Sequence, residues 1–575
     1  MTSDDTGMGL QLPLITPFRS RLTHKLGTAS FPSLRDLTIS QAGEGLRTGK
    51  FTSVDLVKAY LKRIEETKHL VIVMHMDGDA LEVAQMLDKE RAEKGSRSPL
   101  HGIPILVKDE FLPFGWQELA PKASSPPLEL RKKRDPMEFH RLREAGMIIL
   151  GRTNLDDDAG YGIEYPEFSL RNYIHYSRFP IPSGPGTLPG SSKASAVATS
   201  IGLSVASLGT AVSTSISCFL LGNANAGVKE SRVIANAADF SLVGFKPTTR
   251  SMMKSGYFRF SPQGAPTIGI LAKTVKDTVD IMAGIYGQYE HNEWSPRIPS
   301  EQAPEWDEIY KSLELSEFAI GIPRDSFDSD PYPQVMDSFE AALKTLASTG
   351  ATIVDNANFQ GAKELKRLKA QIKSLVHLSE FREDAFRCLT RWGNDSNNPE
   401  NAQRVYNLAR KCPNEEPTER ELNKMLWTRT TRIAANNEEY TKILEKALII
   451  SKHQGIWATM KKHRLDMFII PSSDEGFTLE LAAQENAPVM SVPLGYFPDG
   501  FQGKYTDEIP PEIPLLLIGG PFRDMSLFPV AHAFEQLAAV RDQEPGPRRP
   551  LPKTELVDIQ PFISDMSELQ IDRTD

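Results

Sequence analysis

Short apolar runs alternate with amphipathic stretches along most of this 575-residue chain, and no other feature constrains its fold as strongly. One helix is predicted by an apolar stripe from Val57 to Ile64 with i, i+3, i+4, i+7 spacing, behind a cap at Thr52 or Ser53. Buried strands are predicted at residues 103–107, 147–150, 203–208, 318–322, 351–354, 467–470, 489–492 and 515–518, and further helices near 79–94, 139–145, 195–202 and 335–346. Strands that alternate with helices predict an α/β fold with a largely buried sheet.

The chain is expected to form one large domain that carries a helical insertion. Residues 361–462 form a long stretch that is charged and helical in pattern, and strand patterns return after it. We therefore expect a single domain over residues 1–545, with 361–462 as an insertion or cap on its flank. The remaining residues, 546–575, are rich in proline and acidic side chains, a composition that favours a tail that is disordered in part.

The composition argues weakly against some classes of partner. The chain is 40% hydrophobic and 25% charged with a net charge of -9, which is ordinary for a folded protein and disfavours nucleic acid or an anionic membrane. No window holds about 18 uninterrupted apolar residues, so no transmembrane helix is expected. Cys218, Cys388 and Cys412 are too few for a disulfide framework and fit a reducing compartment, so we expect a cytoplasmic protein.

No metal or nucleotide motif is complete. The eleven histidines show no His-Glu-x-x-His spacing, and no cysteine pair has the spacing of a zinc site. Gly45 to Lys50 does not complete a phosphate-binding loop. We therefore expect a protein without a metal or a cofactor.

The candidate catalytic residues lie in three segments that contain glycine or proline: His101–Asp109, Pro189–Ser195 and Gly209–Ser217. Lys108 closes an apolar run that reads as a buried strand, where a charged amine is costly unless it is paired or neutral. A neutral lysine can act as a base, and serines are the hydroxyls that it would activate. The alternative, when Lys108 is taken alone, is an ordinary lysine at a strand end with its amine extended to solvent. Together, the three segments indicate acyl transfer.

Along these segments and beyond them, the chain resembles the amidase signature family of serine hydrolases. The resemblance includes residues 151–156, 243–248, 271–277, 491–493, 517–522 and 533–536, in the order that the family has them. It implies a large mixed sheet surrounded by helices, and a Ser–cis-Ser–Lys triad that hydrolyses a small-molecule amide through an acyl-enzyme. Whether the protein forms a homodimer stays open.

The resemblance also implies roles for individual residues. Lys108 would be the base, Ser191 the bridging serine and Ser215 the nucleophile; the two serines lie 24 positions apart (215 minus 191), as is typical of the family. The oxyanion would be held by the backbone N–H groups that precede the nucleophile, from Val212, Ser213 and Thr214. Ser192 would support the loop of the bridging serine.

The chain departs from the family pattern at several positions. Lys193 and Ala194 replace a glycine pair after the paired serines, and Ser213 and Thr214 replace the pair before the nucleophile. The stretch from the nucleophile to the later Gly-Phe-Lys-Pro-Thr motif is longer than in the family, which predicts an irregular excursion at residues 218–235. Ser231 is a rival nucleophile if the register is shifted.

Two other functions stay open, and the departures motivate the first of them. The first is a pseudo-amidase or binding protein that retains the fold without turnover. The second, ranked lower, is the A subunit of a tRNA-dependent amidotransferase, which passes ammonia to a partner.

Overall fold

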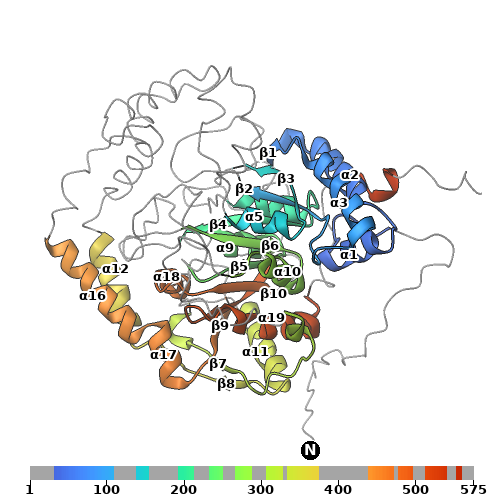
Figure 1. The fold of residues 1–575 in the computed structure, drawn as a ribbon. Coiled ribbons are helices and arrows are strands. Elements are labelled where there is room, and N and C mark those ends of the chain that lie inside the picture. The colour runs from blue at the N-terminus through green and yellow to red at the C-terminus, as the bar shows by residue number, and fades with distance from the viewer. Residues whose placement is uncertain are drawn as a thin grey trace, which may run out of the picture.

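The computed structural model describes residues 31–70, 72–108, 137–154, 192–212, 232–249, 266–287, 306–327, 333–373, 438–471, 477–496, 512–540 and 552–559. Its centre is an 11-stranded sheet in the order β1-β3-β2-β4-β6-β5-β10-β11-β9-β7-β8 (Figure 1). The strands are β1 Val73–Met76, β2 Pro104–Lys108, β3 Ile148–Thr153, β4 Ala206–Val212, β5 Val243–Lys246, β6 Pro266–Ala272, β7 Ala319–Gly321, β8 Thr352–Val354, β9 Met467–Pro471, β10 Val489–Tyr496 and β11 Glu512–Gly519. Strand β2 runs parallel to β3 and β4, whereas β4 runs antiparallel to β6, so the sheet is mixed.

Helices cover both faces of this sheet (Figure 1). They are α1 Ile39–Arg47, α2 Ser53–Glu66, α3 Ala80–Lys94, α5 Met137–Glu144, α7 Lys193–Ser200, α9 Arg232–Asp239, α10 Val275–Ile285, α11 Pro333–Ser348, α12 Ala362–Lys373, α16 Glu438–Gln454, α17 Ile456–His463, α18 Phe477–Gln484 and α19 Leu527–Ala538. On β5, Gly244 faces α9, since a Cβ there would lie 2.5 Å from the Cβ of Ala237. The next residue, Phe245, stacks its ring 4.9 Å from that of Phe528 on α19. Helices α9 and α19 therefore cover opposite faces.

The predicted α/β architecture is confirmed. Each of the predicted strands overlaps an observed one, and Thr52 caps α2 by accepting the backbone N–H of Asp55. Strands β1, β5 and β6 had not been predicted from periodicity. Strand β1 lies at the edge of the sheet with three exposed residues, so it lacks the apolar alternation of a half-buried strand.

The described parts of residues 361–462 are helical, as predicted. Helix α12 packs against α16, and α16 against α17, along one side of the molecule (Figure 1). Residues 374–437 lie outside the described part of the chain. No described helix is both long enough and apolar enough to cross a membrane.

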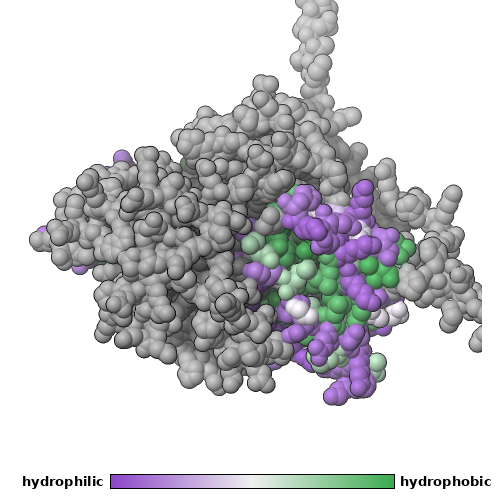
Figure 2. All heavy atoms as spheres, turned by 90° about the horizontal axis from the view of Figure 1, so that it is seen from above, coloured by the Kyte–Doolittle hydropathy of each residue, from purple (hydrophilic) through white to green (hydrophobic). Residues whose placement is uncertain are grey.

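The edge of the sheet at β1 exposes apolar side chains. Met74 and Met76 on β1 are 39% and 53% exposed, and Met86 on α3 is 55% exposed. From above, apolar atoms gather in the middle of the described surface, with polar ones around them (Figure 2). The edge strand is only four residues long, which limits the backbone that it offers to another strand.

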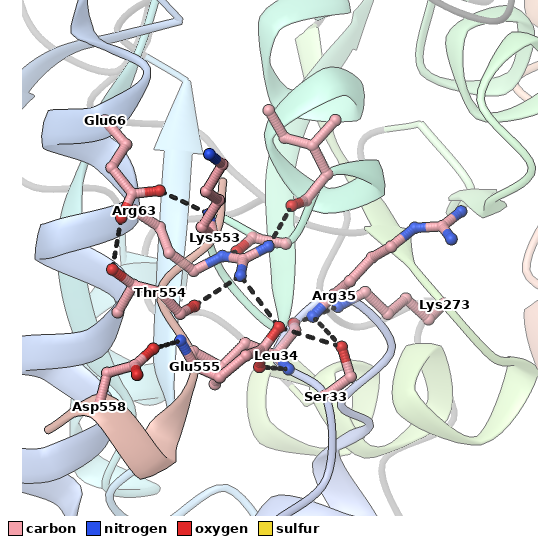
Figure 3. Close-up of polar contacts among 12 residues, drawn as sticks. Ser33, Leu34, Arg35, Arg63, Glu66, Lys273, Lys553, Thr554, Glu555 and Asp558 are labelled. Atoms are coloured by element: carbon pink, nitrogen blue, oxygen red, sulfur yellow. Dashed lines mark hydrogen bonds and ion pairs between the residues drawn. The ribbon is translucent and has the colours of Figure 1, made fainter. Parts of the chain in front are cut away.

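The two ends of the described chain meet at Arg63 (Figure 3). Its guanidinium is 1% exposed and donates to the carbonyls of residues 201 and 202 at 2.8 and 2.7 Å, and to that of Thr554 at 2.7 Å. Glu555 forms an ion pair with Arg63 at 3.3 Å and accepts the backbone N–H of Leu34 at 2.7 Å. Residues 552–559, from the region expected to form a tail, therefore dock on α2, whose Arg63 also binds the carbonyls that follow α7.

Several carboxyl groups are buried in the interior. Asp277 accepts the backbone N–H of Ile39 at 2.9 Å, and Glu485 accepts the first N–H groups of α17 at 2.9 and 3.0 Å. Neither carboxyl oxygen of Glu138 has a hydrogen-bond partner among the described residues. Burial raises the pKa of Asp277 and Glu485 to about 7 and that of Glu138 to about 8.

These raised pKa values predict that the free energy of unfolding falls as the pH rises from about 6.5 to about 7.5. Asp277, Glu485 and Glu138 keep their protons in the folded state where the unfolded chain has released them, so the folded state binds more protons. Burial lowers the pKa of His101 and His532, so they add no opposing slope above about pH 6.5. Burial also lowers the pKa of Lys246 to about 8, so this group adds an opposing slope only as the pH approaches 8. Urea unfolding at several pH values measures this. Glu138→Gln should flatten the upper part of the fall, and stability that rises over this interval contradicts the prediction.

Replacing Arg63 by Met should lower the free energy of unfolding by on the order of 3 kcal/mol, because buried carbonyls and Glu555 lose their charged donor. The exposed ion pair between Arg47 and Glu44 provides a matched control, since both side chains are more than half exposed. Arg47→Met should change stability far less in the same denaturant titration. Equal effects of the two substitutions would show that the buried contacts of Arg63 contribute nothing.

Candidate active site

Lys108 is the last residue of β2 and is fully buried. Its Nζ donates a hydrogen bond to Oγ1 of Thr210 on β4, at 2.6 Å. The parallel register that pairs Val107 with Leu208 brings the end of β2 alongside the middle of β4, and so places this amine beside Thr210. The polar end of an otherwise apolar strand is therefore satisfied inside the protein.

Ser192 forms hydrogen bonds with the backbone of the same threonine. It lies directly before α7, but its hydroxyl does not cap that helix. Instead, Ser192 Oγ donates to the carbonyl of Thr210 at 3.1 Å and accepts the N–H of Thr210 at 3.2 Å. Thr210 thus contacts Lys108 through its side chain and Ser192 through its backbone, so residues from all three chemistry-bearing segments meet there. The supporting role predicted for Ser192 agrees with this contact.

Gly209 allows Ser192 to approach β4 so closely. A Cβ at this position would lie 2.8 Å from Ser192 Oγ, 2.9 Å from Ser192 Cβ and 3.0 Å from Cγ2 of Val233. Contacts this short require the neighbouring atoms to move. The glycine therefore fixes the distance between β4 and the helices α7 and α9.

Small and hydroxyl-bearing residues hold α7 on the sheet. Ser195 Oγ lies 2.7 Å from Thr153 Oγ1 on β3, and Thr199 Oγ1 donates to Ser207 Oγ on β4 at 2.7 Å. All four side chains are buried, and each hydroxyl satisfies another. These bonds fix α7, which follows the proposed bridging serine, relative to β3 and β4.

The other predicted site residues lie at or beyond the limits of the described chain. Val212 is the last residue of β4. Ser191, Ser213, Thr214 and Ser215 lie outside the described residues, as does Ser231. Their roles therefore stay predictions. Thr210, to which the sequence had assigned no role, is the residue that the structure adds; its contact with Lys108 depends on the register between β2 and β4, which no local sequence pattern encodes.

The predicted irregular excursion at residues 218–235 is wrong for its last residues. Residues 232–235 belong to α9, in which Val233 and Ile234 are buried. Gly209 and Gly269 are register partners on β4 and β6, and both face Val233. The helix packs here because the paired glycines leave room for a branched side chain.

The Gly-Phe-Lys-Pro-Thr motif has a structural place on β5, which β6 separates from β4 in the sheet. Lys246 at the end of β5 is fully buried and donates to the carbonyl of Ala487 at 2.6 Å. Thr248 donates its N–H and its hydroxyl to the two carboxyl oxygens of Asp524, each at 2.6 Å. Burial lowers the pKa of Lys246 to about 8. The motif thus joins the middle of the sheet to the turn before α19.

Among the described residues, no three or more His, Cys, Asp or Glu side chains form a group that could hold a metal ion. The polar groups brought together here are an amine and hydroxyls. Such a set is suited to moving a proton between side chains.

The chain belongs to the amidase family, since the family model described as Amidase matches residues 55–218 and 237–500. The residues between these two ranges include most of the predicted insertion. A protein of Arthroderma benhamiae named "Putative amidase" is 26% identical over 552 residues, covering 89% of this chain and 87% of that protein. The A subunit of the glutamyl-tRNA(Gln) amidotransferase of Desulfatibacillum aliphaticivorans is 28% identical over 330 residues, covering 56% of this chain and 61% of that protein.

Solved structures confirm the amidase-signature fold. The native peptide amidase of Stenotrophomonas maltophilia superposes with a TM-score of 0.60 at 22% identity, covering 90% of this chain and 99% of that one. An amidase family protein of Bacillus anthracis superposes with a TM-score of 0.62 at 19% identity, covering 90% and 93%.

Gly209→Ala should displace Ser192 and destabilise the protein by about 1–3 kcal/mol, because the added Cβ meets Ser192 and Val233 at 3.0 Å or less. Gly43→Ala is the matched control, since the nearest atom to its added Cβ is the carbonyl oxygen of Pro99 at 3.7 Å. Thermal unfolding of both variants measures the difference. A Gly209→Ala protein as stable as the Gly43→Ala protein contradicts the close packing described for Ser192.

Proposed function

We propose that this protein is a serine amidase that hydrolyses a carboxylic amide through an acyl-enzyme. The single observation that carries the proposal is the fully buried amine of Lys108, bonded to Thr210 five positions before Ser215 on the same segment. Ser192, the neighbour of Ser191, is bonded to the same threonine. Membership of the amidase family supports this reading.

The proposed reaction begins with attack of Ser215 Oγ on the amide carbonyl. The serine proton passes to Ser191, whose own proton passes to Lys108 Nζ, while backbone N–H groups of Val212, Ser213 and Thr214 stabilise the oxyanion. The proton then returns through Ser191 to the nitrogen of the leaving group, and the C–N bond breaks. Water attacks the resulting ester in the same way, releasing the carboxylic acid and regenerating Ser215.

The altered glycine positions after the paired serines do not argue against activity. Lys193 and Ala194 form the first turn of α7, and neither is among the described residues with positive φ. Residues with side chains adopt a right-handed helix without strain, so glycine is not required there. This geometry weakens one of the reasons for the pseudo-amidase alternative.

Ser215→Ala should abolish labelling by a fluorophosphonate probe and should lower the rate of aryl-amide hydrolysis by about four orders of magnitude or more, because triad members act as a unit. Ser231→Ala is the matched control and should leave labelling and turnover unchanged. Lys108→Ala should slow acylation to a similar degree as Ser215→Ala. Peptide mapping of the labelled protein identifies the modified serine.

Label on Ser231 or Ser191 would refute the assignment of Ser215. A wild-type protein that binds amides but neither hydrolyses them nor reacts with the probe would establish the pseudo-amidase function instead.

A further inference from the structure

We infer that α2 carries a docking site for the chain's own residues 552–559, and that this segment, here called the strap, holds the end of α7 in place through Arg63. The strap lies outside the part of the chain that the family model matches, which ends at residue 500. Its docking is therefore a feature of this chain rather than of the family model. The inference goes beyond the proposed function, and only its expected effect on the rate rests on that function.

Polar contacts fix the strap on one face of α2 (Figure 3). Glu66 accepts the backbone N–H of Lys553 at 2.6 Å and the hydroxyl of Thr554. Three positions earlier, Arg63 donates to the carbonyl of Thr554 at 2.7 Å and forms the ion pair with Glu555. Residues three apart lie on the same face of a helix. This face of α2 therefore offers an acceptor and a donor side by side, and the strap supplies the complementary groups.

A leucine anchors the strap in the core. Leu556 is fully buried and belongs to the main hydrophobic core, whereas its neighbour Val557 is 47% exposed. Burial of a leucine side chain contributes about 1.5–3 kcal/mol. Within the strap, Asp558 accepts the backbone N–H of Glu555 at 2.8 Å and so closes a short turn around the leucine. The strap thus binds through one apolar side chain and a set of polar contacts, as a peptide ligand does.

The guanidinium of Arg63 connects the strap to α7. Its Nη2 and Nε donate to the carbonyls of Ile201 and Gly202 at 2.8 and 2.7 Å, directly after the last turn of α7. Gly202 has a φ of +72°, and a Cβ there would lie 2.6 Å from Cα of Arg35, so this turn is tightly packed. The docked strap helps to keep Arg63 at 1% exposure. Without it, water would reach the guanidinium and compete for the bonds that hold the end of α7.

Both ends of α7 are therefore held by other parts of the chain. Ser192, directly before the helix, is bonded to Thr210 on β4, and Arg63 holds the carbonyls after the helix. The helix has eight residues, which makes it about 12 Å long. A shift at the end of so short a helix would displace Ser192 and its neighbour Ser191, the proposed bridging serine. The strap thus supports the position of the reacting groups from the far end of α7.

The test compares two aspartate substitutions at neighbouring positions of the full-length protein. Leu556→Asp places a charge in the core and should release the strap, whereas Val557→Asp, at an exposed position, should leave it docked. Hydrogen exchange read by mass spectrometry should be at least about tenfold faster in the strap and in residues 193–205 for Leu556→Asp only, with β9 and β11 unchanged. With a soluble aryl amide, kcat of Leu556→Asp should fall about 10-fold, because a displaced serine slows proton transfer.

A second variant keeps the test decisive if Leu556→Asp does not fold. Glu555→Gln retains the buried leucine and removes the charge that pairs with Arg63, so it should change exchange and kcat in the same direction by a smaller factor. Val557→Asp remains its control.

The outcomes separate this inference from the proposed function. Unchanged exchange of the strap in Leu556→Asp overturns the docking site, and a released strap with unchanged exchange in residues 193–205 overturns the link through Arg63. Faster exchange everywhere, β9 and β11 included, also overturns that link, since it shows a loss of global stability. An unchanged kcat beside faster exchange in residues 193–205 overturns the effect on the site. A wild-type protein that does not hydrolyse the amide refutes the proposed function, while the exchange measurements still decide whether the strap holds α7.

Discussion

A lysine amine without contact to solvent must find hydrogen-bond acceptors inside the protein, or its burial destabilises the fold. One such acceptor for Lys108 is the hydroxyl of Thr210, and the contact requires β2 and β4 to run parallel in a fixed register. The backbone of the same threonine binds Ser192, which holds the start of α7 against the sheet. One residue thus links the strand of the proposed base to the helix that follows the proposed bridging serine, and a shift of either element would break the link.

Close packing of helix α9 on β4 and β6 also holds this part of the sheet in place. Gly209 and Gly269 are paired across β4 and β6, and Val233 of α9 occupies the space that their missing side chains leave. The family match stops at residue 218 and resumes at residue 237, inside α9. Residues of this chain that the family model does not match therefore supply part of the helix over β4. An insertion near the proposed nucleophile thus contributes to the core that supports the site.

Much of the fold could be predicted from the sequence, because buried strands and capped helices leave local patterns. The strand at Lys108 and the helix capped by Thr52 are two such elements. The exposed edge strand β1 and helix α9 could not be predicted, since β1 has no apolar alternation and α9 follows a segment rich in turn residues. The sequence also indicated that Lys108 is buried at a strand end. Its partner Thr210 depends on the register between two strands, which no local pattern encodes.

The proposed mechanism requires that a buried amine, held by Thr210, serves a nucleophilic serine. A crystal structure of the protein after reaction with a fluorophosphonate tests it most directly, because it shows the modified atom and the position of the amine together. The account predicts phosphorus bonded to Ser215 Oγ, with Lys108 Nζ within hydrogen-bond distance of both Ser191 Oγ and Thr210 Oγ1. Phosphorus on another residue, or a Lys108 amine turned toward solvent and away from the serines, would contradict it.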